Sequence, residues 1–231
     1  MTVLYMVTEN LYVYAFLKTP VTDLKLPAGI SNSVLLISTS GISALVEPAI
    51  SIELLQSNDE ILIKAVLSHD RVICEVFRQT TVLPLRFGTS FTSQDNLLTY
   101  LESRAEEYLE KLHVMNGKSE YILKFIPRTL DETTTPTASG GRQYFLAKKQ
   151  RYQTQQDFSA IQTTEWENIV ETISQIYESK IVQQEDKEPR IYLLVRSQDE
   201  DLLAEQYLTW QEACPRWELH LGEPLPPYHF I

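Results

Sequence analysis

The sequence is poor in the residues that build several common kinds of site. It has only seven glycines among 231 residues, and it contains neither a GxGxxG nor a GxxxxGK[ST] segment, so no phosphate-binding loop is predicted. Its two cysteines, Cys74 and Cys214, lie far apart and form no CxxC pair, which favours reduced thiols. The four histidines have neither HxxxH nor HxxH spacing, so we expect no structural zinc. We therefore predict no cofactor and no metal ion.

Basic charge is also scarce. Twenty lysines and arginines face 31 aspartates and glutamates, for a net charge of −11. This balance disfavours nucleic acid, since phosphate binding needs clustered cations, and it disfavours an anionic membrane surface. No uncharged apolar stretch approaches the roughly 18 residues that a membrane-spanning helix requires. The first residues show no basic region followed by an apolar core, so no secretion signal is predicted. We expect neither nucleic acid nor a lipid membrane as a partner.

What is present is a succession of strand and helix patterns. Hydrophobic residues make up 43% of the chain, which is typical of a folded protein. In the first half, period-two and period-3.6 patterns predict strands at Asn10–Lys18, Val34–Ser38, Ile42–Val46 and Val82–Phe87, a helix from Ser57 or Asn58 to about Gln79, and a helix at Asn96–Leu112 that Asn116-Gly117 ends.

The second half shows a different order of elements. The patterns predict strands at Tyr121–Ile126, Ile191–Val195 and Trp217–Leu221, a basic helix from Arg142 to about Tyr152, and two helices that start at the capping boxes Thr164-x-x-Glu167 and Ser197-x-x-Glu200. We predict an α+β protein with two domains. Residues 1–116 form a mixed sheet-and-helix domain, and residues 117–231 form a modified ferredoxin-like domain with a helical insertion.

One trio of residues is a candidate for catalysis. Cys74 could act as a thiolate nucleophile that His69 activates, with Glu75 beside it. However, His69 and Cys74 are five residues apart on a predicted helix, so their side chains point in different directions. We therefore expect both to have packing roles.

Arg86 is an unusual residue for its surroundings. It lies in the apolar segment Val82–Phe87, where a buried guanidinium needs a carboxylate or several carbonyl acceptors. Asp70 or Glu75 on the preceding helix could supply the carboxylate. We expect an internal clamp between helix and strand; the alternative is an exposed anchor for an acidic group of a partner.

Two further segments are candidates for binding a partner. The stretch from Arg142 to Arg151 carries only basic charges, and the stretch from Asp157 to Glu188 is mainly acidic; they are either mutually attracting helix faces or a docking surface. The stiff, apolar segment Pro224–Ile231 is predicted to pack against its domain, and the alternative is a partner-binding extension. The candidate partner-binding residues are Arg142, Lys148, Lys149, Arg151, Tyr228 and Phe230.

The run from His69 to Phe91 resembles the signature of the gas vesicle protein F/L family. The residues that carry this resemblance are His69, Glu75, Pro84, Arg86, Phe87 and Gly88. Three other segments are similar to segments of the family: Leu11–Ala15 to its opening strand, Gly141–Lys149 to the segment before a basic helix, and Pro224–Phe230 to its Pro-rich terminus. In the last of these, Glu223 and Leu225 stand where the family has Gly and Trp.

The resemblance implies a function that the residues alone do not. It implies a minor structural and assembly component of gas vesicles, which give prokaryotic cells buoyancy. Such a protein is expected to bind the major hydrophobic shell protein, to limit its aggregation during vesicle nucleation, and to stay on the gas-facing surface of the wall, inside a prokaryotic cytoplasm. Other gas vesicle accessory proteins are further expected partners. Two alternatives stay open: an assembly chaperone that is absent from mature vesicles, and, more remotely, an enzyme that uses His69 and Cys74. We expect no enzymatic activity.

Overall fold

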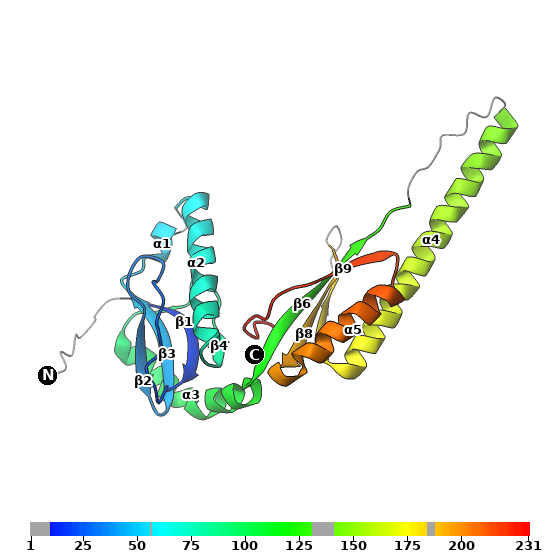
Figure 1. The fold of residues 1–231 in the computed structure, drawn as a ribbon. Coiled ribbons are helices and arrows are strands. Elements are labelled where there is room, and N and C mark those ends of the chain that lie inside the picture. The colour runs from blue at the N-terminus through cyan, green and yellow to red at the C-terminus, as the bar shows by residue number, and fades with distance from the viewer. Residues whose placement is uncertain (1–9, 56, 131–140, 184–187) are drawn as a thin grey trace. The chain divides into compact units, whose positions relative to one another are not determined.

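The computed structural model describes residues 10–55, 57–130, 141–183 and 188–231 (Figure 1). It confirms the predicted α+β class, because the chain combines helices with antiparallel strand pairs. The chain divides into two compact units. Unit 1 runs to Glu120 and also includes Pro224–Ile231, and unit 2 comprises Tyr121–Glu223. Independent folding of residues 1–116 and 117–231 stays a prediction, but the last eight residues group with unit 1.

Unit 1 is built around the buried central strand β1. Its strands form an antiparallel sheet in the order β2-β3-β1-β4, and β5 also pairs with β1. The strands are β1 (Leu11–Lys18), β2 (Leu35–Thr39), β3 (Ile42–Pro48), β4 (Val82–Pro84) and β5 (Ser90–Phe91).

Helices pack on both faces of this sheet. A bulge in β1 shifts the register between Val13 and Ala15, so residues on both sides of it contribute to one core, which α2 (Asp59–Phe77) covers. On the opposite face Phe16 contacts Tyr108 of α3 (Gln94–Met115), with 4.9 Å between ring centroids. A short helix, α1 (Ile52–Leu55), precedes α2. The central strand is therefore covered on both sides, as its continuous burial requires.

Local signals place several of these elements where the sequence predicts them. The Asn58 side chain accepts a hydrogen bond from the Glu60 amide and caps α2. The β2–β3 hairpin turns at Ser40 and Gly41, whose φ angles are 49° and 81°, as a two-residue turn of the primed type requires. After α3, Gly117 has a φ of 68°, so the predicted Asn116-Gly117 stop is confirmed.

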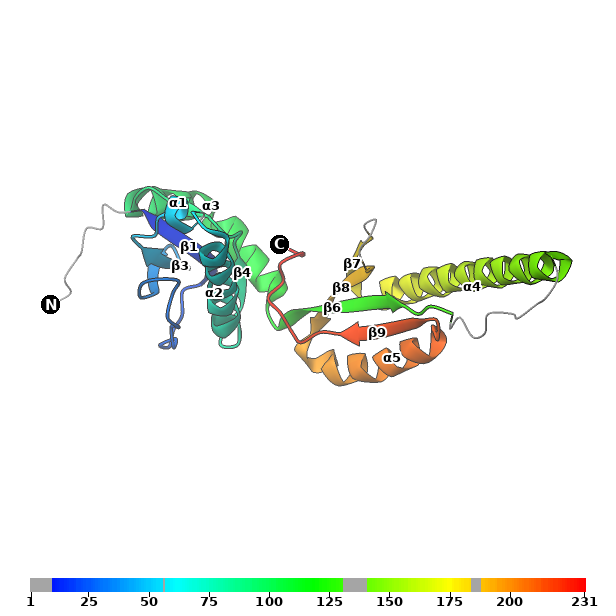
Figure 2. The same ribbon diagram turned by 90° about the horizontal axis from the view of Figure 1, so that it is seen from above.

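Unit 2 has the strand order of a ferredoxin-like fold. Its elements follow the order strand, helix, strand, strand, helix, strand, and its sheet has the order β7-β8-β6-β9 (Figure 2). The elements are β6 (Lys118–Pro127), α4 (Gly141–Ile176), β7 (Glu178–Val182), β8 (Arg190–Arg196), the 3-10 turn η1 (Ser197–Asp199), α5 (Glu200–Ala213) and β9 (Trp217–Leu221).

Both helices of unit 2 pack on one face of its sheet. Alternate residues of β6, β8 and β9 share a single core with side chains from α4 and α5. At its centre Phe125 meets Trp166 edge-on, with ring centroids 4.7 Å apart, and Trp217 lies 6.0 Å from both rings. Trp210 of α5 joins the same core.

Two elements of unit 2 differ from the prediction. The predicted basic and acidic helices are one continuous helix, α4, of 36 residues. The predicted helical insertion is the extra length of this helix. Thr164 is not a cap: its hydroxyl donates to the Ala160 carbonyl at 3.0 Å, one turn earlier. In addition, residues around Ile181, which the apolar spacing assigns to a helix, form β7 and pair with β8.

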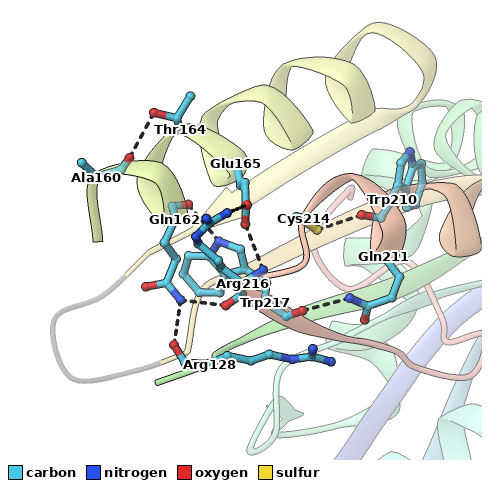
Figure 3. A network of polar contacts seen from close by, with 10 residues as sticks. All are labelled: Arg128, Ala160, Gln162, Thr164, Glu165, Trp210, Gln211, Cys214, Arg216 and Trp217. Atoms are coloured by element: carbon cyan, nitrogen blue, oxygen red, sulfur yellow. Dashed lines mark hydrogen bonds and ion pairs between the residues drawn. The ribbon is translucent and has the colours of Figure 1, made fainter. Parts of the chain in front are cut away.

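Polar contacts fix the middle of α4 to the start of β9 (Figure 3). The Glu165 carboxylate pairs with the Arg216 guanidinium at 2.5 Å and also accepts from the Arg216 amide at 3.1 Å. One turn earlier, the side-chain amide of Gln162 donates to the Arg216 backbone carbonyl at 2.8 Å. The Trp217 indole N–H donates to the Gln162 backbone carbonyl at 2.9 Å. Towards the N-terminus of α4 from this anchor, the helix extends beyond the sheet (Figure 1) and its side chains are mostly exposed.

Candidate functional site

His69 is the polar centre of unit 1. Its ring is 5% exposed. The Tyr12 hydroxyl lies 2.8 Å from Nδ1, and the Leu85 carbonyl oxygen lies 3.1 Å from Nε2. Because a carbonyl can only accept, Nε2 carries the proton and Nδ1 accepts from Tyr12 in the neutral ring. The ring also stacks on Tyr14 and meets Phe87 edge-on. His69 therefore joins α2 to β1 and to the segment after β4.

We expect unit 1 to lose stability below about pH 6.5 through His69. Burial lowers the pKa of His69 from its usual value, against opposing effects of the Leu85 carbonyl and Asp70. The unfolded chain takes up a proton near pH 6.5, whereas the folded chain resists it. Below that pH the unfolded state binds more protons, so the free energy of unfolding falls as pH falls, by at most about 1.4 kcal/mol per pH unit for one group.

The measurement is a urea melt at pH 7.5, 6.5 and 5.5. All three tryptophans, Trp166, Trp210 and Trp217, lie in unit 2, so their fluorescence follows unit 2, and circular dichroism follows both units. We expect His69→Gln to remove part of the pH dependence of unit 1, and the exposed His113→Gln to leave it unchanged. An identical slope in His69→Gln and wild type would contradict this role.

Glu47 is a buried carboxylate that the sequence analysis missed. Its side chain accepts hydrogen bonds from the Tyr14 hydroxyl and from three successive amides, those of Ile30, Ser31 and Asn32. The hydrogen bonds from the Ile30 and Ser31 backbone amides are each 2.7 Å long. A carboxylate directly after the apolar strand Ile42–Val46 was the available signal. Glu47 fastens a loop to the sheet beside His69.

The predicted trio of His69, Cys74 and Glu75 is not brought together. Both ring nitrogens of His69 have partners other than Cys74. Burial raises the pKa of the Cys74 thiol, which also contacts Tyr228, so a reactive thiolate is disfavoured. Glu75 pairs instead with Arg71 at 3.2 Å on the surface of α2. The contacts of His69 and Cys74 are those of packing, as predicted for them.

The predicted internal clamp of Arg86 is wrong. The strand ends at Pro84, and Arg86 lies in a turn in which the Thr89 amide and hydroxyl donate to the Arg86 carbonyl at 3.1 and 2.7 Å. Gly88 completes this turn with a φ of 89°. The Arg86 side chain is exposed. Within the described ranges its guanidinium forms no ion pair. The two carboxylates predicted for it have other partners: Asp70 binds Tyr228, and Glu75 binds Arg71.

The closing segment, residues 224–231, packs onto unit 1. The amides and carbonyls of Glu120 and Leu225 exchange two hydrogen bonds of 2.8 Å. The Glu120 carboxylate, which is fully buried, accepts from the His229 amide at 2.8 Å and lies 2.7 Å from His229 Nδ1. The Tyr228 hydroxyl donates to Asp70 at 2.5 Å, and Phe230 is 9% exposed. Tyr228 and Phe230, two of the predicted partner-binding residues, are therefore engaged within the chain itself.

The other predicted partner-binding residues lie on the extended half of α4. Arg142, Lys148, Lys149 and Arg151 are all exposed there. Apolar side chains accompany them: Phe145 is 71% exposed and Tyr152 is 63% exposed. This half of α4 is a basic and aromatic surface within unit 2.

The described part of the chain offers no cluster of ligands for a metal ion. Among those residues, none of the helices combines the length with the apolar composition that a membrane span requires. The predicted absence of metal and cofactor therefore stays a prediction about the whole chain.

Comparison with known proteins gives matches of three kinds. The family model described as gas vesicle synthesis protein GvpL/GvpF matches residues 10–231. Gas vesicle protein F from Streptomyces sp. (strain CB03234) is 38% identical over 58 residues, so this match spans about a quarter of either protein (25% of this chain and 24% of the relative).

Two crystal structures share the fold at low sequence identity. Gas vesicle protein GvpF from Anabaena sp. PCC7120 has a TM-score of 0.73 at 16% identity, over 96% of this chain and 95% of that one. GvpF from Microcystis aeruginosa has a TM-score of 0.68 at 17% identity, over 96% and 98%. The match of the family model to nearly the whole described chain, with this shared fold, shows that the protein belongs to the gas vesicle GvpL/GvpF family.

Proposed function

We propose that this protein binds the hydrophobic shell protein of gas vesicles, limits its aggregation during nucleation, and stays on the gas-facing surface of the wall. Membership of the gas vesicle family supports a role in these organelles. A shell subunit with a large apolar face must keep that face from water before it joins the wall, since exposed apolar surface drives aggregation. A partner that covers this face needs an apolar surface of its own.

The observation that carries this proposal is an exposed apolar row on α2. Ile63, Val66 and Leu67 occur at spacings of three and four residues and therefore share one face of the helix. They are 59%, 41% and 65% exposed. Further along the same face, Asp70 and Cys74 contact Tyr228. The closing segment, residues 224–231, thus contacts the later part of this face of α2 through Tyr228, whereas the earlier part is open to a partner.

We expect the double variant Ile63→Ser/Leu67→Ser to bind the shell protein about 10- to 100-fold more weakly. Burial of each of these side chains contributes about 1.5–3 kcal/mol at most, and both are partly exposed in the free protein. The variant should also lose most of its ability to reduce light scattering by refolding shell protein. Stability should change little, because exposed side chains contribute within about 0.5 kcal/mol.

A matched control is Leu208→Ser, which alters a side chain of similar exposure, 62%, on α5 of unit 2. It should bind as wild type does. Equal binding by the double variant and this control would exclude the α2 row as the interface. The basic residues of α4, Arg142, Lys148, Lys149 and Arg151, remain proposed contacts for the shell protein or for another accessory protein.

The proposed location has its own test. Intact vesicles are washed with chaotrope and then collapsed, and the protein is followed by immunoblot with and without protease. Protein on the gas-facing surface should survive washing and become sensitive to protease only after collapse. Its absence from washed vesicles would exclude a place on the gas-facing surface, and only the role of an assembly chaperone would then stand. We propose no catalytic role, because the two most reactive candidates, His69 and Cys74, are occupied by packing contacts.

A further inference from the structure

A small pocket in unit 1 carries the exposed Arg86. Its volume is about 370 Å³, near the lower end of the range of roughly 300–1,000 Å³ for ligand sites. Its walls come from the turn after β4, from α3 and from the closing segment of the chain. The apolar lining includes Pro84, Leu85, Tyr108 and Ile231. A pocket of this size fits a short segment of a partner.

The charged side chains that line this pocket are both basic. Arg86 and Lys111 line it, and no aspartate or glutamate side chain does. Lys111 is partly neutralised, because its ammonium group lies 3.2 Å from the Glu107 carboxylate on the exposed side of α3. Arg86 has no such partner among the described residues. The chain as a whole carries a net charge of −11, so an unneutralised arginine beside apolar walls is a local feature that favours an anion.

The backbone holds Arg86 in place. On one side, the Leu85 amide donates to the Tyr14 carbonyl at 2.8 Å, and the Leu85 carbonyl accepts from His69. On the other side, Thr89 donates twice to the Arg86 carbonyl. The guanidinium is therefore presented from a fixed backbone, which lowers the entropy lost on binding. Arginine also suits carboxylates, which it can bind through two parallel hydrogen bonds.

We infer that this pocket binds a carboxylate side chain carried on an apolar segment of the shell protein. This inference rests on the proposed function and adds a second, charged contact to the apolar row on α2. Arg86 and Lys111 supply the charge, and the aliphatic and aromatic walls take the neighbouring apolar side chains. The two contacts differ in their response to salt, because ions screen exposed charges but not apolar contacts.

The test is the affinity of immobilised shell protein for variants of the full chain at 50 and 300 mM salt. At 50 mM salt we expect Arg86→Gln to bind about 10-fold more weakly than wild type and Arg86→Glu about 100-fold more weakly, since a like charge then faces the carboxylate. Arg86→Lys should retain part of the affinity. The loss should shrink at 300 mM salt. Arg104→Gln is the control, because Arg104 is an exposed arginine of α3 that does not line the pocket.

The outcomes separate this inference from the proposed function. Wild-type binding with equal binding by Arg86→Glu would overturn the inference and leave the proposed function standing. A lower denaturation midpoint in Arg86→Gln, with proportionate loss of binding, would also overturn it, because Arg86 would then act within the fold. If the wild-type protein does not bind, the proposed function fails first and the inference fails with it. Salt-dependent loss confined to the Arg86 variants supports it.

Discussion

Glu47→Ala is expected to destabilise unit 1 by at least about 3 kcal/mol. The Glu47 side chain is fully buried and accepts four hydrogen bonds, from the Tyr14 hydroxyl and three loop amides. Hydrogen bonds to a charged group contribute roughly 1.5–3 kcal/mol each, and a buried donor without an acceptor costs about 1–3 kcal/mol. The loop amides can regain water, but the Tyr14 hydroxyl lies inside the core.

Urea melts measure this effect, with circular dichroism for both units and tryptophan fluorescence for unit 2. We expect an earlier transition for unit 1 and no change in fluorescence. Glu60→Ala is the control, because Glu60 is an exposed glutamate of the same unit with a surface pair to Lys64. Gly29→Ala is a second probe: a Cβ there would lie 2.0 Å from Glu47 Oε2 and would displace the carboxylate. A loss below 1 kcal/mol in Glu47→Ala would show that the carboxylate is not an anchor.

The parts of the fold that the sequence predicts are those with local causes. Asn58 caps α2 through a bond to the Glu60 amide two residues away. Ser40 and Gly41 turn a hairpin whose strands are adjacent in sequence. The core face of α2 is only partly predicted. Helical spacing places Val66, His69, Ile73 and Val76 on one face; His69, Ile73 and Val76 are buried, but Val66 lies at the edge of that face and is 41% exposed.

The errors come from patterns that have two physical outcomes. Thr164 with Glu167 has the spacing of a capping box, yet a threonine inside a helix can bond the carbonyl one turn earlier, and Thr164 does so. Ile181 continues the apolar spacing of a helix, but pairing with β8 makes its segment a strand. The segment Val82–Phe87 alternates as a strand would, but it turns after Pro84, and this turn exposes Arg86.

The site itself depends on contacts between distant residues. Glu47 binds a loop some 16 residues earlier, and Glu120 binds His229, 109 residues later. Nothing in the spacing around either glutamate identifies these partners. The family resemblance identified the segments that meet in unit 1, including His69 and the closing segment, but only the structure shows that they lie in the same unit.

Deletion of residues 224–231 is expected to destabilise unit 1 by about 3 kcal/mol or more. The deletion removes Phe230, which is 9% exposed, and burial of such a side chain contributes about 1.5–3 kcal/mol. It also removes both hydrogen bonds from His229 to the buried Glu120 carboxylate, and an unsatisfied buried group costs about 1–3 kcal/mol or more when charged. The Tyr228 bond to Asp70 is lost as well.

The expected result is an earlier circular dichroism transition with an unchanged tryptophan transition, because the deleted residues pack on unit 1 while the tryptophans report on unit 2. Ile231→Ser is the control, since Ile231 is 40% exposed and its replacement should change stability little.

The point variants Glu120→Gln and Phe230→Ala should each reproduce part of the loss of stability. The fragment of residues 1–116 lacks Glu120 and the tail, so if it folds alone it should be less stable than unit 1 in the whole chain. A tail deletion that shifts the tryptophan transition and spares unit 1 would place the stabilising contacts of the tail elsewhere.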